Sequence, residues 1–86
     1  MKRKQLELLC KRLVAELAQR PYSQWQAVSF PHVYTEQRGG TNICVELIVL
    51  EDKPAYLHIA VAVDDGKWLR KFLPVSSSFI VKKPTG

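Results

Sequence analysis

The residues of this chain best suited to catalysis are Cys44, Glu46 and His58. A thiol beside an imidazole can act as a nucleophile with its base, and a carboxylate can orient the imidazole. All three fall on one face of two predicted neighbouring strands, because residues two apart in a strand share a face. A histidine that is half-buried on a sheet is the simpler interpretation, so we expect the chain not to be an enzyme.

The two cysteines, Cys10 and Cys44, lie 34 positions apart on different predicted elements. They form no CxxC pair, and the histidines and carboxylates show no zinc-ligand spacing, so we expect no metal site and no cofactor. Both cysteines are expected to be buried free thiols, whereas a disulfide would require an oxidising compartment. Gly39-Gly40 is not followed by a helix, so it predicts a turn rather than a phosphate-binding loop. The sequence points to no small-molecule substrate.

A change of apolar period shows which elements must carry these residues. Apolar residues recur every three or four positions over residues 5–19 and every two over residues 43–63, which predicts one amphipathic helix followed by strands. We expect an α+β fold, with a single N-terminal helix packed on an antiparallel four- to five-stranded meander sheet, in one domain spanning residues 1–86. The helix is predicted over about residues 5–20, and the strands over about residues 25–34, 41–50, 55–63, 68–74 and 79–82.

The predicted helix has an apolar stripe and a basic outer side. Pro21 ends it, because proline disfavours helical geometry at the residue before it, and Tyr22-Ser23-Gln24 form the connection. Leu8 and Ala15 point outward among basic residues; a single exposed leucine needs no explanation, and a small contact surface is the alternative. The core-facing residues are Leu6, Leu9, Cys10, Leu13, Val14 and Leu17.

Turn residues and register arrange the predicted strands. Because of Pro31, residues 25–34 are expected to form an edge strand or two short pieces. Residues 36–40 are expected to form a glycine turn, and Ser76-Ser77-Ser78 predicts a break or a bulge. The apolar residues of the two central strands occupy odd positions in both. Both sets of apolar residues face the same core only if the numbers of two paired residues add up to an even number. Such pairing requires a loop of three or five residues between the strands or a β-bulge.

The opposite face of the central strands is semi-apolar, whereas a water-facing sheet usually alternates apolar residues with Thr, Lys, Glu or Arg. With one helix available, we expect something else to cover this face: the last strand folded over it, a second copy of the chain, or a partner protein. The candidate partner-binding residues are Ile48, Tyr56, His58, Ala60 and Ala62.

The formal net charge of +5 is concentrated near the N-terminus, where residues 1–20 contain six Lys or Arg against two Asp or Glu. This asymmetry favours an acidic partner. Aromatic and basic residues that interleave on a strand can stack bases and neutralise phosphates, although the aromatic ones can equally face the core. The candidate nucleic-acid-binding residues are Lys67, Trp68, Arg70, Lys71 and Phe72, with Lys11 and Arg12 of the helix.

These observations predict a small, non-catalytic protein-interaction domain, either a homodimer or an accessory protein of the inhibitor or immunity type. The alternative is an RNA- or DNA-binding domain that uses the basic helix and residues 67–72. No apolar run approaches the roughly 20 residues of a membrane span, and no signal peptide is recognisable, so we expect a cytoplasmic protein with no membrane contact.

Overall fold

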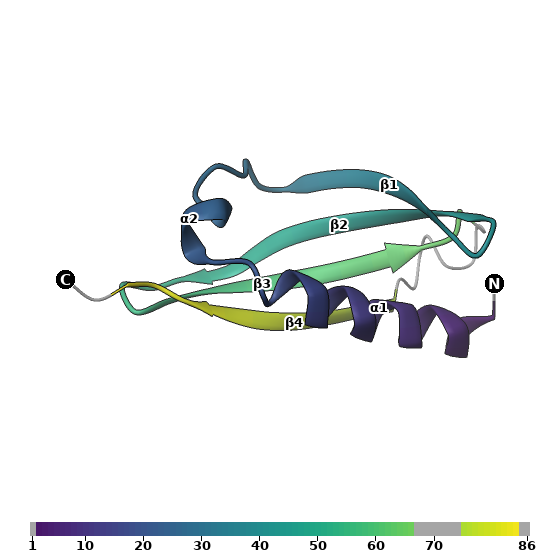
Figure 1. Ribbon diagram of the computed structural model, residues 1–86, viewed down its shortest axis with the longest axis horizontal. Helices are drawn as coiled ribbons and strands as arrows, with labels where there is room; N and C mark the ends of the chain where they lie inside the picture. The colour runs from purple at the N-terminus through teal and green to yellow at the C-terminus, as the bar shows by residue number, and fades with distance from the viewer. Residues whose placement is uncertain (1, 67–74, 85–86) are drawn as a thin grey trace.

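The computed structural model describes residues 2–66 and 75–84, and it has the α+β fold that the sequence predicts (Figure 1). Each strand pairs antiparallel with the next, so the described strands form a four-stranded meander with β1 and β4 as its outer members. The elements in chain order are α1 (Arg3–Leu17), α2 (Tyr22–Trp25), β1 (His32–Arg38), β2 (Thr41–Asp52), β3 (Tyr56–Asp64) and β4 (Val75–Lys82).

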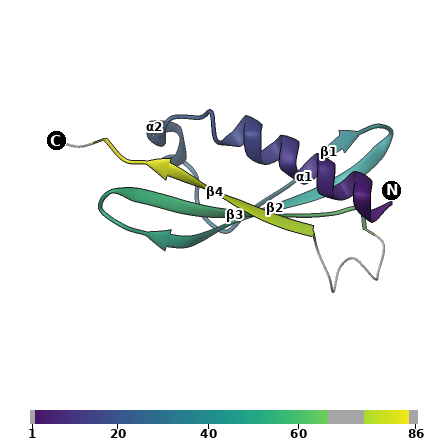
Figure 2. The ribbon, with the colours of Figure 1, turned by 90° about the horizontal axis from the view of Figure 1, so that it is seen from below.

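The helix α1 covers one side of the sheet, where it packs over β3 and β4 (Figure 2). Its predicted apolar stripe is confirmed, since every member is buried except Val14, which is half-buried. The stripe meets alternate residues of the strands, among them Ile43, Val45, Ile59 and Val61, none of which exposes any surface. Burial of such a side chain stabilises the fold by roughly 1.5–3 kcal/mol, so this layer holds the domain together.

The predicted strand over residues 25–34 is wrong in its first half. Trp25 belongs to the short helix α2, in the segment that the sequence assigned to a plain connection and a strand. Its ring is buried and lies 6.3 Å from the ring of Phe30 and 5.5 Å from that of Phe79. A short helix in a connecting segment can bury an aromatic ring without the alternation of apolar and polar residues that marks a strand. The apolar content of the segment was therefore not sufficient to predict a strand. The strand β1 begins after Pro31 and is an edge strand, as predicted.

Two further boundaries differ from the prediction. The strand β1 continues to Arg38, so the turn contains only Gly39 and Gly40, whose φ angles of 56° and 77° favour glycine. The strand β4 begins at Val75, and Ser76-Ser77-Ser78 pair regularly with β3 instead of breaking the strand. The serines are exposed, so their polarity reflects contact with water and not an interruption of the ladder. The strand predicted over residues 68–74 lies outside the described residues.

The register between β2 and β3 confirms the prediction of an even sum. Leu47 pairs with Val61, and Ile48 pairs with Ala60. The register then shifts between Val49 and Glu51, which is the second of the two predicted alternatives, a β-bulge. This extra residue lets a tight turn join the strands while keeping both sets of large apolar side chains on the side of α1.

Candidate protein-interaction face

The side of the sheet away from α1 is called the open face here. Its residues follow from the pairing of the strands, because paired residues of neighbouring strands point to the same side. The central part of the face is given by the pairs Ile48 with Ala60 and Ala60 with Ser78. The paired residues of the open face are Val33, Thr35, Gln37, Asn42, Cys44, Glu46, Ile48, Glu51, Tyr56, His58, Ala60, Ala62, Asp64, Ser76, Ser78, Ile80 and Lys82. Leu50, which lies in the bulge between Val49 and Glu51, is assigned to the same face because it follows Val49, a residue of the opposite face.

The structure brings all five predicted partner-binding residues onto this face. Tyr56, His58, Ala60 and Ala62 alternate along β3 and are half-buried, and Ile48 is exposed beside them on β2. The common orientation of the four β3 residues was predictable from the strict alternation of that strand. That they bind a partner stays a prediction.

Most of the exposed large apolar side chains gather on the open face. Among the described residues these side chains are Leu8, Val33, Ile48, Leu50 and Ile80, with exposed fractions of 38 to 56%. All except Leu8 belong to the open face. Val33, Leu50 and Ile80 were missed because their orientation depends on where β1 begins, on the bulge in β2 and on the full length of β4. Exposed apolar side chains that gather on one face are a feature of contact surfaces.

The face is low in its centre and higher around it. Ala60 pairs with Ser78, and Ala62 pairs with Ser76, so four small side chains form a platform across β3 and β4. The larger side chains of Ile48 and Leu50 stand on β2, and that of Ile80 stands on β4. This relief allows the backbone of another element to approach the sheet closely over the platform while the larger side chains contact its flanks.

Carboxylates dominate the charge of the open face. Glu46 and Asp64 are half-buried, Glu51 is exposed, and Lys82 is exposed at one end. Cys44 lies between two of these carboxylates and was predicted to be buried, but it is only half-buried because it faces this side of the sheet. Its pKa is raised by desolvation, then by Asp64 and Glu46. The open face is therefore acidic as well as apolar.

A polar bridge across three strands crosses the open face. Nε2 of His58 lies 2.9 Å from Oγ of Ser78, and Nδ1 lies 3.6 Å from Oε1 of Glu51. The hydroxyl of Tyr56 donates to the other oxygen of Glu51 at 3.4 Å, and its pKa is raised by desolvation, then by that carboxylate. The sequence did not predict Ser78 or Glu51 as partners of His58, because both contacts depend on the register and the bulge.

The same bridge corrects the catalytic hypothesis. Cys44 pairs with Asp64, and Glu46 pairs with Ala62, so each lies rows away from His58 along the strands. The observed order of serine, histidine and carboxylate matches that of an activated nucleophile. On the face, Ser78 is surrounded by Ala60, Ser76 and Ile80, and its contact with His58 holds both side chains in place. We interpret the bridge as a fixed polar contact.

The nucleic-acid candidates are only partly placed. Lys11 and Arg12 are exposed on α1, whereas Lys67, Trp68, Arg70, Lys71 and Phe72 lie outside the described residues. Within residues 2–66 and 75–84, no group of three or more His, Cys, Asp or Glu could hold a metal ion, and no helix is long and apolar enough to cross a membrane.

Comparison of the chain with known protein families, with curated proteins and with solved structures gives no match. The residues themselves are therefore the basis for any functional assignment.

Proposed function

We propose that this chain is a small, cytoplasmic, non-catalytic protein-interaction domain that binds a partner protein through the open face. The observation that carries the proposal is the gathering of Val33, Ile48, Leu50 and Ile80 on one face, where no described helix covers them. Side chains of this size contribute little to folding while they remain in water. Covered by a partner, the same surface would contribute to binding.

The size of the open face fits a modest interface. Four strands about 4.8 Å apart and about five rows of side chains span roughly 600 Å² per partner, near the lower end of specific interfaces. The small residues Ala60, Ala62, Ser76 and Ser78 would lie at the centre of this contact. An interface of this size supports a specific complex when its centre is apolar and well packed.

The charge of the open face favours a partner protein over a second copy of the chain. The open face carries three carboxylates, those of Glu46, Glu51 and Asp64. Its basic side chain, among the residues described, is that of Lys82. Two stacked copies would bring these carboxylates toward one another in a partly desolvated layer, which is unfavourable. We therefore expect the partner to present apolar side chains flanked by Lys or Arg.

The test introduces a photo-crosslinking benzoylphenylalanine in place of Ile80 and compares two further changes in that background. Ala60→Arg places a charge in the centre of the face and should weaken binding by roughly 2–5 kcal/mol, so the crosslinked adduct should disappear. Ala15→Arg makes the same change on the exposed side of α1 and should leave the adduct intact. Native-like circular dichroism and thermal unfolding of both variants check the fold.

The result also identifies the occupant. The purified chain should sediment as a monomer, and the adduct formed in cells should contain one copy of the chain and a second protein. An adduct between two copies would replace the partner by a homodimer. An adduct that survives Ala60→Arg would show that the open face is not the binding surface.

A further inference from the structure

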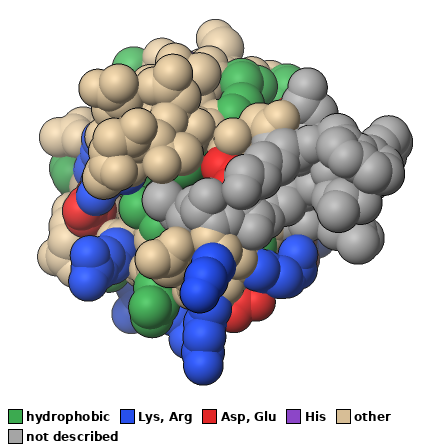
Figure 3. Space-filling model, turned by 90° about the vertical axis from the view of Figure 1, so that its right-hand side faces the viewer, with side chains coloured by type: hydrophobic (Ala, Val, Ile, Leu, Met, Phe, Trp, Pro, Cys, Tyr) green, Lys and Arg blue, Asp and Glu red, His purple; other side chains and the backbone are tan. Residues whose placement is uncertain are grey.

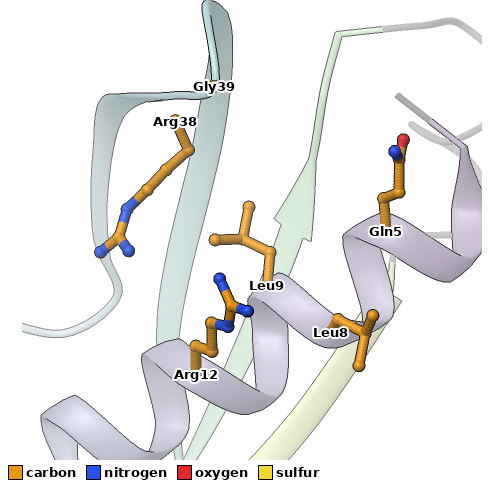
Figure 4. A pocket seen from close by; sticks show the side chains of 6 residues that line it. All are labelled: Gln5, Leu8, Leu9, Arg12, Arg38 and Gly39. Atoms are coloured by element: carbon orange, nitrogen blue, oxygen red, sulfur yellow. The ribbon is translucent and has the colours of Figure 1, made fainter.

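A second surface lies on the opposite side of the molecule, between the first half of α1 and the turn that joins β1 to β2. It is a cleft of about 300 Å³ lined by Gln5, Leu8, Leu9, Arg12, Arg38 and Gly39 (Figure 4). Leu8 is the one exposed large apolar side chain, among those described, that does not belong to the open face. The cleft thus combines an apolar wall with two guanidinium groups.

The guanidinium group of Arg38 is already committed. Its Nη2 lies 3.0 Å from Oε2 of Glu16, and its Nε donates to Glu36. These two carboxylates raise the pKa of Arg38, so the group is charged but locally neutralised. Arg38 therefore supplies the carbon chain that forms one wall of the cleft and ties β1 to α1.

Arg12, by contrast, has an uncommitted charge. On a helix it could pair with residues four positions away, which are Leu8 and Glu16. Leu8 is apolar, and Glu16 is turned toward Arg38. Arg12 makes no ion pair with any residue in the described part of the chain, and its side chain extends from α1 at the edge of the cleft (Figure 4).

The surroundings of Arg12 are basic. Lys4 and Lys11 are exposed on α1, whereas Glu7 on the same helix is paired with Arg3. Figure 3 shows Lys and Arg side chains gathered over the lower part of this end of the molecule, where α1 begins. An acidic ligand would be attracted to this end, and Leu8 and Leu9 would give it an apolar contact.

We propose that the cleft binds an acidic segment of a partner protein, with a carboxylate of that segment on Arg12 and a neighbouring apolar side chain against Leu8 and Leu9. One carboxylate can make two parallel hydrogen bonds with a guanidinium group, which fixes its position as well as its charge. The proposal does not depend on the open face, which lies on the other side of the sheet.

The test is a nuclear magnetic resonance titration of the isotope-labelled chain with an acetylated, amidated pentapeptide, Leu-Glu-Leu-Glu-Leu. The backbone amides of Leu8, Leu9 and Gly39 should shift and saturate. The matched peptide Leu-Gln-Leu-Gln-Leu should bind at least about tenfold more weakly, because it lacks the charge.

Variants of two adjacent helical residues separate the cleft from general charge. Arg12→Gln should weaken binding of the acidic peptide about tenfold, whereas Lys11→Gln, which removes the same charge outside the cleft, should change it less than twofold. Leu8→Ala should weaken binding of both peptides, and Ala60→Arg on the open face should leave it unchanged. Equal effects of Arg12→Gln and Lys11→Gln, or equal binding of the two peptides, would overturn the proposal. Tighter binding of a single-stranded DNA oligonucleotide or of decanoate at the same amides would overturn the choice of a protein partner.

Discussion

The two faces of the sheet are formed by alternate residues of the same strands, yet they differ sharply in the size and burial of their side chains. Along β3, Ile59 and Val61 point toward α1 and are fully buried, whereas Ala60 and Ala62 point to the open face and are half-buried. The core face carries large apolar side chains, which fill the space beneath the helix. The open face carries small side chains in its centre and exposed apolar ones around them.

This difference separates the residues that stabilise the fold from those that stay available for contact with another molecule. An apolar side chain stabilises the fold in proportion to the area that folding removes from water. Ile59 satisfies that condition, and Ile80 does not, since 56% of it remains exposed. The exposed apolar residues therefore contribute little to the free energy of folding. They would contribute to the free energy of binding if another molecule covered them.

The largest expected effect comes from truncating matched isoleucines on the two faces. Ile59→Ala should lower the free energy of unfolding by about 2–5 kcal/mol, because it leaves a cavity beneath α1. Ile80→Ala should lower it by less than about 1 kcal/mol, because water already contacts much of the side chain. Urea denaturation of the two variants, with unchanged slopes, measures both values.

A contradictory outcome is easily recognised in this pair. Equal losses for Ile59→Ala and Ile80→Ala would mean that the open face is covered in the free chain. The distinction between a stabilising face and a recognition face would then fail, and the proposed partner site with it.

Alternation along the strands was sufficient to predict the division between faces, but the sequence alone could not predict the contacts across them. The stripe of α1 and the even-sum register of β2 and β3 follow from period and parity, which are properties of single segments. The contacts of His58 with Glu51 and Ser78 depend on a bulge in one strand and the start of another. Trp25 was misplaced for a similar reason, because its packing partners Phe30 and Phe79 come from separate segments.

The two cysteines provide a test of intermediate expected size, because Cys10 belongs to the core side of the sheet and Cys44 to the open face. Cys10 is buried on the core-facing side of α1, and its thiol donates a hydrogen bond to the carbonyl oxygen of Val61 at 3.7 Å, whereas Cys44 is half-buried on the open face. In the native chain, Cys44 should react with a thiol reagent at least about a hundredfold faster than Cys10, which reacts only when α1 opens. Mass spectrometry of the labelled peptides against time measures the two rates.

The single-cysteine variants give the corresponding energies. Cys10→Ala should cost about 1 kcal/mol through lost packing, and Cys44→Ala should cost less. Fast labelling of Cys10 in the folded chain, or equal rates at the two sites, would contradict the arrangement of the faces.

The smallest expected effect is a loss of stability at alkaline pH that depends on Cys10. Burial raises the pKa of the Cys10 thiol above its ordinary value of 9.0, so the folded chain retains the proton after the unfolded chain begins to lose it. The folded state then binds more protons, and the free energy of unfolding must fall as the pH rises past that ordinary value. The loss of unfolding free energy is at most about 1.4 kcal/mol for one group at one pH unit above that ordinary pKa.

Urea denaturation between pH 8 and 9.5 should show this decline in the native chain and a shallower one in Cys10→Ala. Tyr34, whose pKa is raised from 10.0 by burial and then by Glu36, acts in the same direction only at higher pH. An identical decline in the native chain and in Cys10→Ala would show that the thiol is not shielded by the covered face.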